Sequence, residues 1–235
     1  MIELLPGGAD YVRLRAHLPH WDGLIHHVQR ARRILNLDAD VDAATYQLDD
    51  DPVIGALVQA QPGVRPPGTW DPFETGVRAI LGQQVSVTGA TTIAGRIVAR
   101  HGMPVPGLGS LGLTHLFPAP AALADADLGG LGLTSARAQT VRGLATAAAN
   151  GALPLDGSVG LDELVASVSA LPGIGPWTAQ YLALRLGEPD AFPATDLGLE
   201  RVITRLAGPD VSVPSLADAW RPWRAHAAAH LWMAG

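Results

Sequence analysis

The chain has 235 residues and a net charge of −6, and 48% of its residues are hydrophobic against 16% charged, a balance that excludes an intrinsically disordered protein. It contains no cysteine, and all 16 basic residues are arginines, which excludes disulfides, cysteine-ligated metal or iron–sulfur centres and lysine Schiff bases. No apolar run approaches the roughly 18 residues that cross a bilayer, and the N-terminus lacks the pattern of an export signal, so we expect a soluble, cytoplasmic protein.

Proline and glycine divide most of the chain into helical segments, and no series of strands or βα units is visible, so the predicted fold is mainly α-helical. Residues 11–16 alternate apolar and polar side chains and predict one short strand. Helices are expected over residues 22–35, 51–61, 71–81, 86–100, 135–149, 161–170, 176–186, 197–206 and 215–233.

Two of these helices have clear start signals, and one of these is Ser86, which can cap the helix over 86–100. Asp71 is suited to an N-cap, Pro72 to the first helical position and Glu74 to the third. After this helix, Gly82 is followed by Gln83 and Gln84, which interrupt the apolar periodicity before the next helix begins. The plain interpretation of the two glutamines is a polar helix break exposed to solvent.

The segment LPGIGPWTA, residues 171–179, predicts a helix, a tight turn and a new helix that begins at Pro176. Amides at the start of that second helix, at the positive end of its dipole, suit a phosphate oxygen. Such a hairpin holds a DNA backbone without a basic residue, which offsets the objection that an acidic chain binds nucleic acid poorly. The alternative is an ordinary helix–turn–helix connection with a glycine C-cap.

Asp196 lies in the loop FPATDL, between the second hairpin helix and the helix over 197–206. An aspartate before an apolar helix is commonly an N-cap. It is also a candidate catalytic carboxylate, and the two roles are compatible because a capping carboxylate is rigidly held.

The hairpin LPGIGPWTAQYLALR, followed by FPATDLGLERV, resembles the helix–hairpin–helix GPD superfamily of DNA glycosylases. The segment WDPFETGVRAILGQQVSVTGATTIAGRIV and the C-terminal AWRPWRAHAAAHLWMAG are similar to the 3-methyladenine DNA glycosylase II (AlkA-type) family, whose members remove alkylated bases. The resemblance runs from about Arg30 to the C-terminus, and the motifs occur in the family's order.

The resemblance implies roles for individual residues. Asp196 matches the catalytic aspartate, which would stabilise an oxocarbenium-like sugar or position the attacking water. Trp177 stands where bifunctional relatives carry a Schiff-base lysine, so we expect a monofunctional enzyme that leaves an intact abasic site. Trp177 and Trp232 match pocket tryptophans, and Tyr181 lies one turn beyond Trp177; electron-rich rings attract the cationic bases that alkylation creates. Core packing is the plain alternative for each aromatic residue.

Other implied sites concern the DNA and a cation. Gln83 and Gln84 lie where the family inserts a wedge into the duplex, although Gln84 stands in place of a leucine. The hairpin residues Gly173, Ile174, Gly175 and Thr178 would bind the DNA backbone. The carbonyls of Ser169, Leu171 and Ile174 would hold a structural Na⁺ or K⁺, and we expect no other cofactor.

His226 and His230 are four residues apart and have the spacing of a metal pair, but no third ligand accompanies them. We therefore assign no metal to them and expect a solvent-facing or core-edge pair.

The expected organisation has three parts. Residues 1–47 form a truncated remnant of an N-terminal β-sheet domain, with its last strand and helix. Residues 71–189 form a helical subdomain with the hairpin, and residues 48–70 plus 190–235 form a second helical subdomain that carries Asp196. The base pocket is expected between the two.

The sequence thus predicts a monomeric DNA glycosylase that flips alkylated purines of the 3-methyladenine type out of duplex DNA and hydrolyses their N-glycosidic bond, in base excision repair. One alternative is a non-catalytic hairpin module that recognises damaged or abasic DNA. Another is a helical protein-interaction bundle, which predicts no salt-dependent DNA binding.

Overall fold

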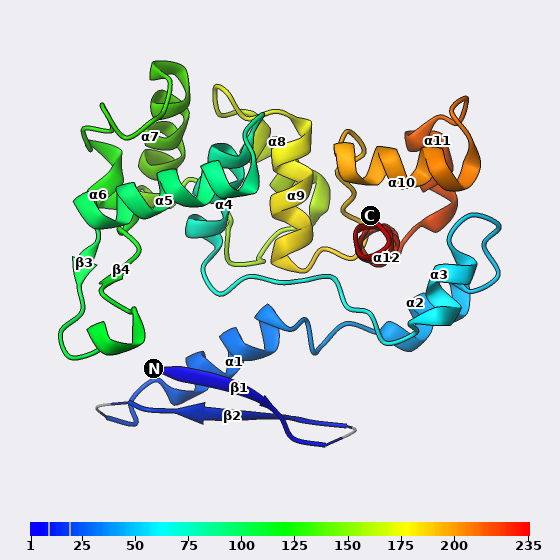
Figure 1. Ribbon diagram of the computed structural model, residues 1–235, viewed down its shortest axis with the longest axis horizontal. Coiled ribbons are helices and arrows are strands. Elements are labelled where there is room, and N and C mark those ends of the chain that lie inside the picture. Colours follow the sequence, from blue (N-terminus) through cyan, green and yellow to red (C-terminus); the bar gives the residue numbers. More distant parts are fainter. Residues whose placement is uncertain (9, 19) are drawn as a thin grey trace.

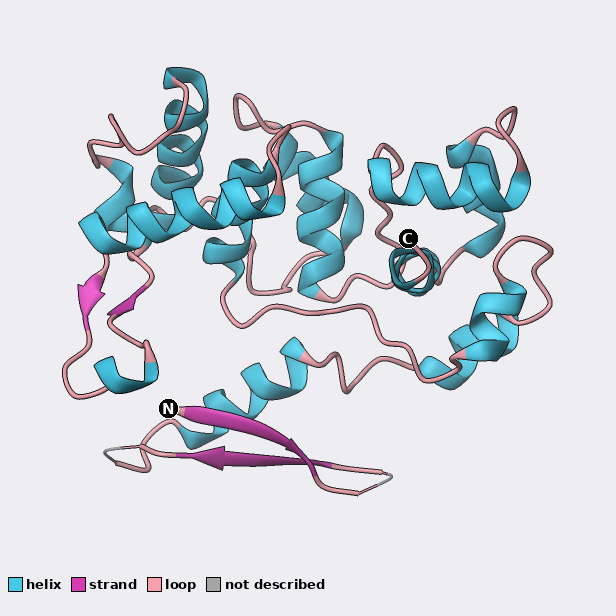
Figure 2. Ribbon diagram, viewed as in Figure 1, coloured by secondary structure: helices cyan, strands magenta, loops and turns pink. Residues whose placement is uncertain are grey.

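The computed structural model describes residues 1–8, 10–18 and 20–235, and over these residues the chain is mainly helical (Figures 1 and 2). The strands of the described part form two antiparallel pairs, β1 (Ile2–Pro6) with β2 (Val12–Ala16) and β3 (Met103–Pro104) with β4 (His115–Leu116). The helices are α1 (Leu24–Ile34), α2 (Val41–Leu48), α3 (Gly55–Ala60), α4 (Pro72–Gly82), α5 (Val87–His101), α6 (Pro120–Ala124), α7 (Ser135–Ala149), α8 (Leu161–Ser169), α9 (Pro176–Leu186), α10 (Leu197–Ala207), α11 (Val213–Ala217) and α12 (Arg224–Met233).

The predicted capping signals form the expected contacts. The Asp71 carboxylate accepts the Glu74 amide at 3.1 Å, and Pro72 occupies the first turn of α4. Ser86 caps α5 by accepting the Gly89 amide at 3.2 Å. These contacts fix where α4 ends and α5 begins, and therefore the place of the turn between them.

Helix α4 lies at the centre of the larger group of helices and packs against α5, α7 and α9. Its apolar face is buried, with Val77, Ile80 and Leu81 fully inaccessible. Helix α8 packs against α9 to complete the hairpin. The start of α9 is thus held by a packed core on two sides.

A second group of helices surrounds α12, which contacts α10 and α3. Trp220 is fully buried here; its Nε1 donates to Oδ2 of Asp51 at 2.9 Å, and its ring meets Phe192 edge-on with centroids 5.8 Å apart. Asp190 accepts the Arg224 guanidinium at 2.7 Å. These contacts fix the loop that leads from α9 to α10.

The structure differs from the sequence prediction in several places, among them residues 101–134, where β3, β4 and α6 were not predicted. Strand β1 pairs with β2 and was not predicted, so the N-terminal residues contain a hairpin rather than a single strand. The helix expected over 51–61 is shorter, and α2 precedes it. The helix expected over 215–233 is divided into α11, a 3-10 turn and α12, because Pro222 lacks an amide donor and cannot continue a helix.

No helix in the described part of the chain is both long and apolar enough to span a membrane.

Candidate functional site

Asp196 is the N-cap of α10 and lies partly exposed in a groove. Its Oδ1 accepts the backbone amides of Gly198 at 3.0 Å and Leu199 at 3.1 Å. Two indole groups also donate to the carboxylate: Nε1 of Trp232 to Oδ1 at 3.1 Å and Nε1 of Trp177 to Oδ2 at 2.9 Å. Four donors converge on one carboxylate, and together they fix its orientation in the groove.

The aromatic side chains lie beside this carboxylate. Trp177 and Tyr181 occupy successive turns of α9 and stack with ring centroids 5.3 Å apart and planes at 10°. Trp232 comes from α12 and meets Tyr181 edge-on at 6.3 Å. All three are half-buried. The structure therefore brings together the four residues that the sequence placed in the catalytic centre and base pocket.

Two adjoining hollows share Trp177, Gly82, Val85 and Val87. The outer one is a groove of about 1010 Å³ that contains Asp196 together with the α4–α5 turn and the hairpin. The inner one has a volume of about 380 Å³ and is lined by Trp177, Tyr181 and Arg185. That volume lies within the range of ordinary small-molecule pockets. We call the rings of Trp177, Tyr181 and Trp232 the aromatic wall; Trp177 and Tyr181 line the inner hollow, and Trp232 lines neither hollow.

The hairpin forms one wall of the groove. Gly173 adopts a φ of +86°, and a Cβ at this position would lie 2.0 Å from Oγ1 of Thr140. Gly175 is the N-cap of α9, with Pro176 in the first turn. The amides of Trp177 and Thr178 at the start of α9 have no backbone acceptor in the described part of the chain. Trp177 is half-buried and Thr178 is buried, so the start of α9 is a candidate anion site at the Trp177 amide.

Gln83 and Gln84 lie in the turn between α4 and α5 but differ in their contacts. Nε2 of Gln83 donates to Oγ1 of Thr178 at 2.9 Å and to the Gly173 carbonyl at 3.3 Å, so its side chain joins this turn to the hairpin. Gln84 is exposed and has a φ of +56°, a conformation that non-glycine residues seldom adopt. In Figure 1 the hairpin and this turn lie along the upper edge of the molecule.

The carbonyls proposed for a monovalent cation belong to the same hairpin. The Leu171 carbonyl accepts the Ile174 amide at 3.1 Å, as part of the turn itself. Ser169 ends α8. Cation binding by Ser169, Leu171 and Ile174 stays a prediction.

His226 and His230 are not solvent-facing, because their exposed fractions are 2% and 5%. Burial lowers the pKa of His226 to about 4, and it lowers the pKa of His230 as well. The described residues contain no group of metal-ligating side chains around them. Because both histidines are buried, they lie on the side of α12 that packs against the rest of the protein.

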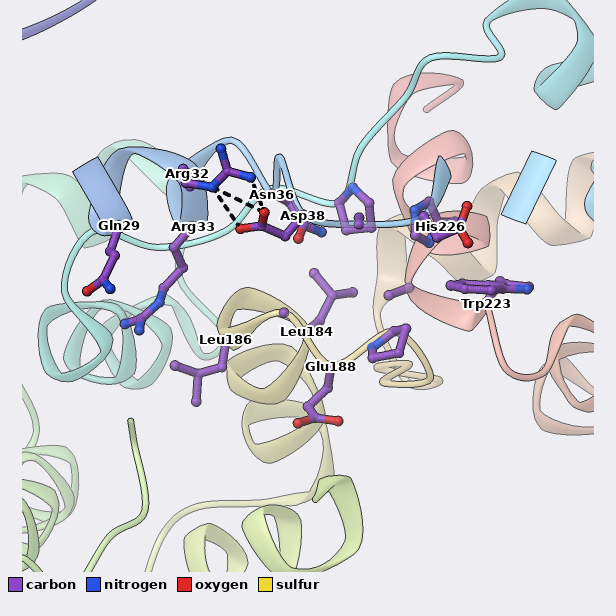
Figure 3. A pocket seen from close by; sticks show the side chains of 16 residues that line it. Gln29, Arg32, Arg33, Asn36, Asp38, Leu184, Leu186, Glu188, Trp223 and His226 are labelled. Carbon is purple, nitrogen blue, oxygen red and sulfur yellow. Dashed lines mark hydrogen bonds and ion pairs between the residues drawn. The ribbon is translucent and has the colours of Figure 1, made fainter. Parts of the chain in front are cut away.

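His226 lies with Trp223 at one end of a further cavity of about 870 Å³, between α1 and the C-terminal end of α9 (Figure 3). The Arg32–Asp38 ion pair lies on its α1 side. This cavity shares no residue with the Asp196 groove. It therefore belongs to a different part of the surface from the candidate catalytic carboxylate.

Three arginines of the site escaped sequence reasoning. Arg137 donates through Nη2 to the Gln83 carbonyl at 2.5 Å, and Arg201 lines the groove five residues after Asp196. Arg185 donates through Nη1 to the Tyr181 hydroxyl at 2.7 Å. Of these three arginines, only Arg185 could have been identified from the sequence, because it follows Tyr181 by four residues and so lies on the same face of the helix.

Comparison with known families agrees with this geometry. Residues 77–223 match the family described as the HhH-GPD superfamily base excision DNA repair protein, and residues 4–71 match the AlkA N-terminal domain. The match to the AlkA N-terminal domain extends to residue 71, beyond residue 47, where the N-terminal unit was expected to end.

Among curated relatives, the chain is 42% identical over 240 residues to a protein named probable bifunctional transcriptional activator/DNA repair enzyme AlkA, from Mycobacterium tuberculosis; the match covers 99% of this chain and 47% of that protein. It is 37% identical over 183 residues to DNA-3-methyladenine glycosylase 2 of Escherichia coli, a match that covers 76% of this chain and 63% of the relative. The chain thus spans about half the length of the first of these relatives.

Among solved structures, a 3-methyladenine DNA-glycosylase from Archaeoglobus fulgidus superposes with a TM-score of 0.81 at 22% identity, over 99% of this chain and 81% of that one. This likeness shows the helical fold that the sequence predicted. The family match covers more than half of the chain and includes both the hairpin and Asp196. The chain therefore belongs to the HhH-GPD superfamily of base excision DNA repair proteins.

Proposed function

We propose that this chain is a monofunctional DNA glycosylase that hydrolyses the N-glycosidic bond of alkylated purines, of the 3-methyladenine type, in duplex DNA. The observation that carries the proposal is the position of the Asp196 carboxylate. It lies in an open groove beside the α8–α9 hairpin and is bound by two tryptophans of the aromatic wall. The name of the Escherichia coli relative, DNA-3-methyladenine glycosylase 2, supports the same activity, and that of the Mycobacterium tuberculosis relative supports a role in DNA repair.

The hydrogen bonds of Asp196 suggest which oxygen acts. Oδ1 accepts three N–H groups, from Gly198, Leu199 and Trp232, which exceeds its two lone pairs in simple geometry. Oδ2 accepts only the Trp177 indole and so retains a free lone pair within the described structure. We therefore assign Oδ2 to the sugar: its charge stabilises the positive charge that develops at C1′ as the base departs, or it accepts a proton from the attacking water.

The leaving base would be held by the aromatic wall. A purine alkylated at N3 or N7 is cationic, and the rings of Trp177, Tyr181 and Trp232 attract a cation by about 0.5–2 kcal/mol each in a desolvated site. The positive charge also weakens the glycosidic bond, so a fixed carboxylate and a stacked base supply the remaining stabilisation.

The duplex would be held by the α9 hairpin and opened by the adjacent turn. Backbone amides at the start of α9 face a phosphate, with Gly173, Ile174, Gly175 and Thr178 forming the contact. Because the Gln83 side chain is bound to the hairpin, we assign the wedge to Gln84, which is exposed at the tip of the turn. A wedge offsets part of the few kcal/mol that unstacking costs.

The reaction would end at the abasic site. The chain has no lysine, so the route through a lysine Schiff base and strand cleavage is closed. We propose that the protein acts as a monomer. A cytoplasmic, nucleoid-associated location would follow from the substrate.

The test is a single-turnover assay of base release from a methylated duplex. Asp196→Asn keeps an oxygen for the Gly198 and Leu199 amides and removes the charge, so release should fall by about 10²-fold or more while binding to abasic-site DNA persists. Glu200→Gln removes a charge from the exposed side of the same helix turn and serves as the matched control. Undiminished release by Asp196→Asn would refute the assignment. Tight abasic-site binding without any release by the wild-type protein would favour a non-catalytic binding module.

A further inference from the structure

The guanidinium of Arg185 donates three hydrogen bonds within the protein. Arg185 is half-buried on α9, four residues after Tyr181, and lines the inner hollow together with Tyr181 and Trp177. Its Nη1 donates to the Tyr181 hydroxyl at 2.7 Å, while Nε and Nη2 both donate to the Gly68 carbonyl, at 3.1 and 2.7 Å. The guanidinium therefore joins the aromatic wall to the segment that precedes α4.

Gly68 is also held in place by contacts with the end of α1. It is buried, its amide donates to the Ile34 carbonyl at 3.1 Å, and a Cβ at this position would lie 1.8 Å from the Arg33 carbonyl oxygen. Only glycine permits this approach between the end of α1 and the linker. A continuous series of contacts thus runs from the N-terminal unit through Gly68 and Arg185 to Tyr181.

The direction of the Arg185 bond determines what the tyrosine hydroxyl can do. A guanidinium only donates, so the Tyr181 oxygen accepts this bond, and its own proton remains free to be donated. The described part of the chain offers that proton no acceptor. The hydroxyl stands at the hollow that the base would enter.

We infer that Arg185 is a positioning residue of the base pocket: it orients the Tyr181 hydroxyl as a hydrogen-bond donor to the flipped base and anchors the tyrosine to the linker at Gly68. The inference rests on the proposed function and deepens it. It specifies the substrate as a purine that presents a hydrogen-bond acceptor to Tyr181. Any positive charge on that purine would be attracted by the aromatic rings of the protein.

The experiment compares wild-type protein, Arg185→Gln, Tyr181→Phe and the double variant. Three quantities are measured: single-turnover release of methylated purines from a duplex, the Kd of free 3-methyladenine from quenching of tryptophan fluorescence, and the Kd of an abasic-site duplex. Arg32→Gln, which removes an exposed guanidinium of α1 remote from the groove, is the control.

Each single variant should lower release and free-base affinity about three- to tenfold, the effect of one hydrogen bond. The double variant should be no worse than the worse single variant, because both remove the same oriented hydroxyl. Abasic-site binding should be unchanged, since no base then enters the hollow. A merely structural role would instead move abasic-site binding.

Additive losses, unchanged free-base affinity or a parallel loss of abasic-site binding would each overturn the inference. So would a wild-type protein that does not bind the free base. Absence of base release from wild-type protein that still binds the free base contradicts only the proposed activity, because the titration of the free base tests Arg185 without catalysis.

Discussion

Trp177 and Asp196 are 19 residues apart, on different helices, and are joined by a hydrogen bond of 2.9 Å from the indole Nε1 to the carboxylate Oδ2. Trp232 adds a second indole donor, at 3.1 Å on Oδ1. The two tryptophans therefore have a polar function beside the stacking function that the family resemblance implies. They hold the carboxylate through both of its oxygens.

Replacing each tryptophan by phenylalanine separates these functions. Trp177→Phe and Trp232→Phe keep an aromatic ring and remove one N–H donor to a charged acceptor, a bond of about 1.5–3 kcal/mol. We expect base release to fall by roughly ten- to hundredfold in each variant. Single-turnover rates measure the change. Trp223→Phe changes a tryptophan that makes no hydrogen bond to Asp196 in the described structure and does not line the groove, so it should leave the rate unchanged. Equal losses in all three variants would contradict the polar role.

The hairpin glycine offers a test of backbone geometry. Gly173→Ala places a Cβ 2.0 Å from the Thr140 hydroxyl at a φ of +86°, which should cost about 2–4 kcal/mol of the free energy of unfolding. It should also weaken binding to abasic-site DNA by displacing the amides at the start of α9. Urea denaturation and a DNA titration measure the two effects.

The matched control for this prediction is Gly143→Ala on α7, where a Cβ would contact nothing. Alanine is favoured over glycine within a helix by about 0.5–1 kcal/mol, so this variant should be unchanged or slightly more stable. Equal stability of the two alanine variants would show that the tight approach of Gly173 to Thr140 does not hold the hairpin.

The sequence predicted the local features of this site well, because they depend on short-range rules. Asp71, Ser86 and Asp196 cap helices as their positions indicated, and the glycines of the hairpin form the expected turn. Periodicity does not encode which side chains meet across helices, so the indole bonds to Asp196 and the Arg185 link to Gly68 could not be predicted.

The difference between short-range rules and contacts across the fold also explains which predictions from the sequence were wrong. Strand β1 is five residues whose partner is fixed by pairing with β2, a contact that the isolated sequence IELLP does not reveal. Of the two positions expected for His226 and His230, the solvent-facing one is wrong: both are buried, and the four alanines of their helix allow close packing of α12.

The two adjacent glutamines should respond differently to alanine. Gln83→Ala removes hydrogen bonds to Thr178 and Gly173, so it should lower the free energy of unfolding by about 1 kcal/mol and loosen the hairpin. Gln84→Ala removes an exposed side chain and should leave stability within about 0.5 kcal/mol while slowing base release from duplex DNA. Denaturation and single-turnover rates test both variants. A release rate unchanged by Gln84→Ala would contradict its role as the wedge.

The buried histidines predict a pH dependence of stability. The pKa of His226 is lowered to about 4 in the folded protein, chiefly by desolvation and then by His230 and Arg65, whereas an unfolded histidine titrates near 6.5. Between these values the unfolded chain binds more protons than the native one, so the free energy of unfolding falls as the pH drops from about 6.5 to about 4. The full effect of His226 is about 3 kcal/mol, and the lowered pKa of His230 acts in the same direction.

His226→Phe tests this origin directly, because it retains a ring to meet Trp223 edge-on, where the centroids lie 5.6 Å apart, and cannot be protonated. Urea denaturation at pH 7.5 and pH 5 should show a smaller loss of stability on acidification in the variant than in wild-type protein. His26→Gln, on the exposed face of α1, should retain the wild-type loss. If His226→Phe and wild-type protein lose the same free energy between the two pH values, the acid sensitivity does not arise from burial of neutral His226.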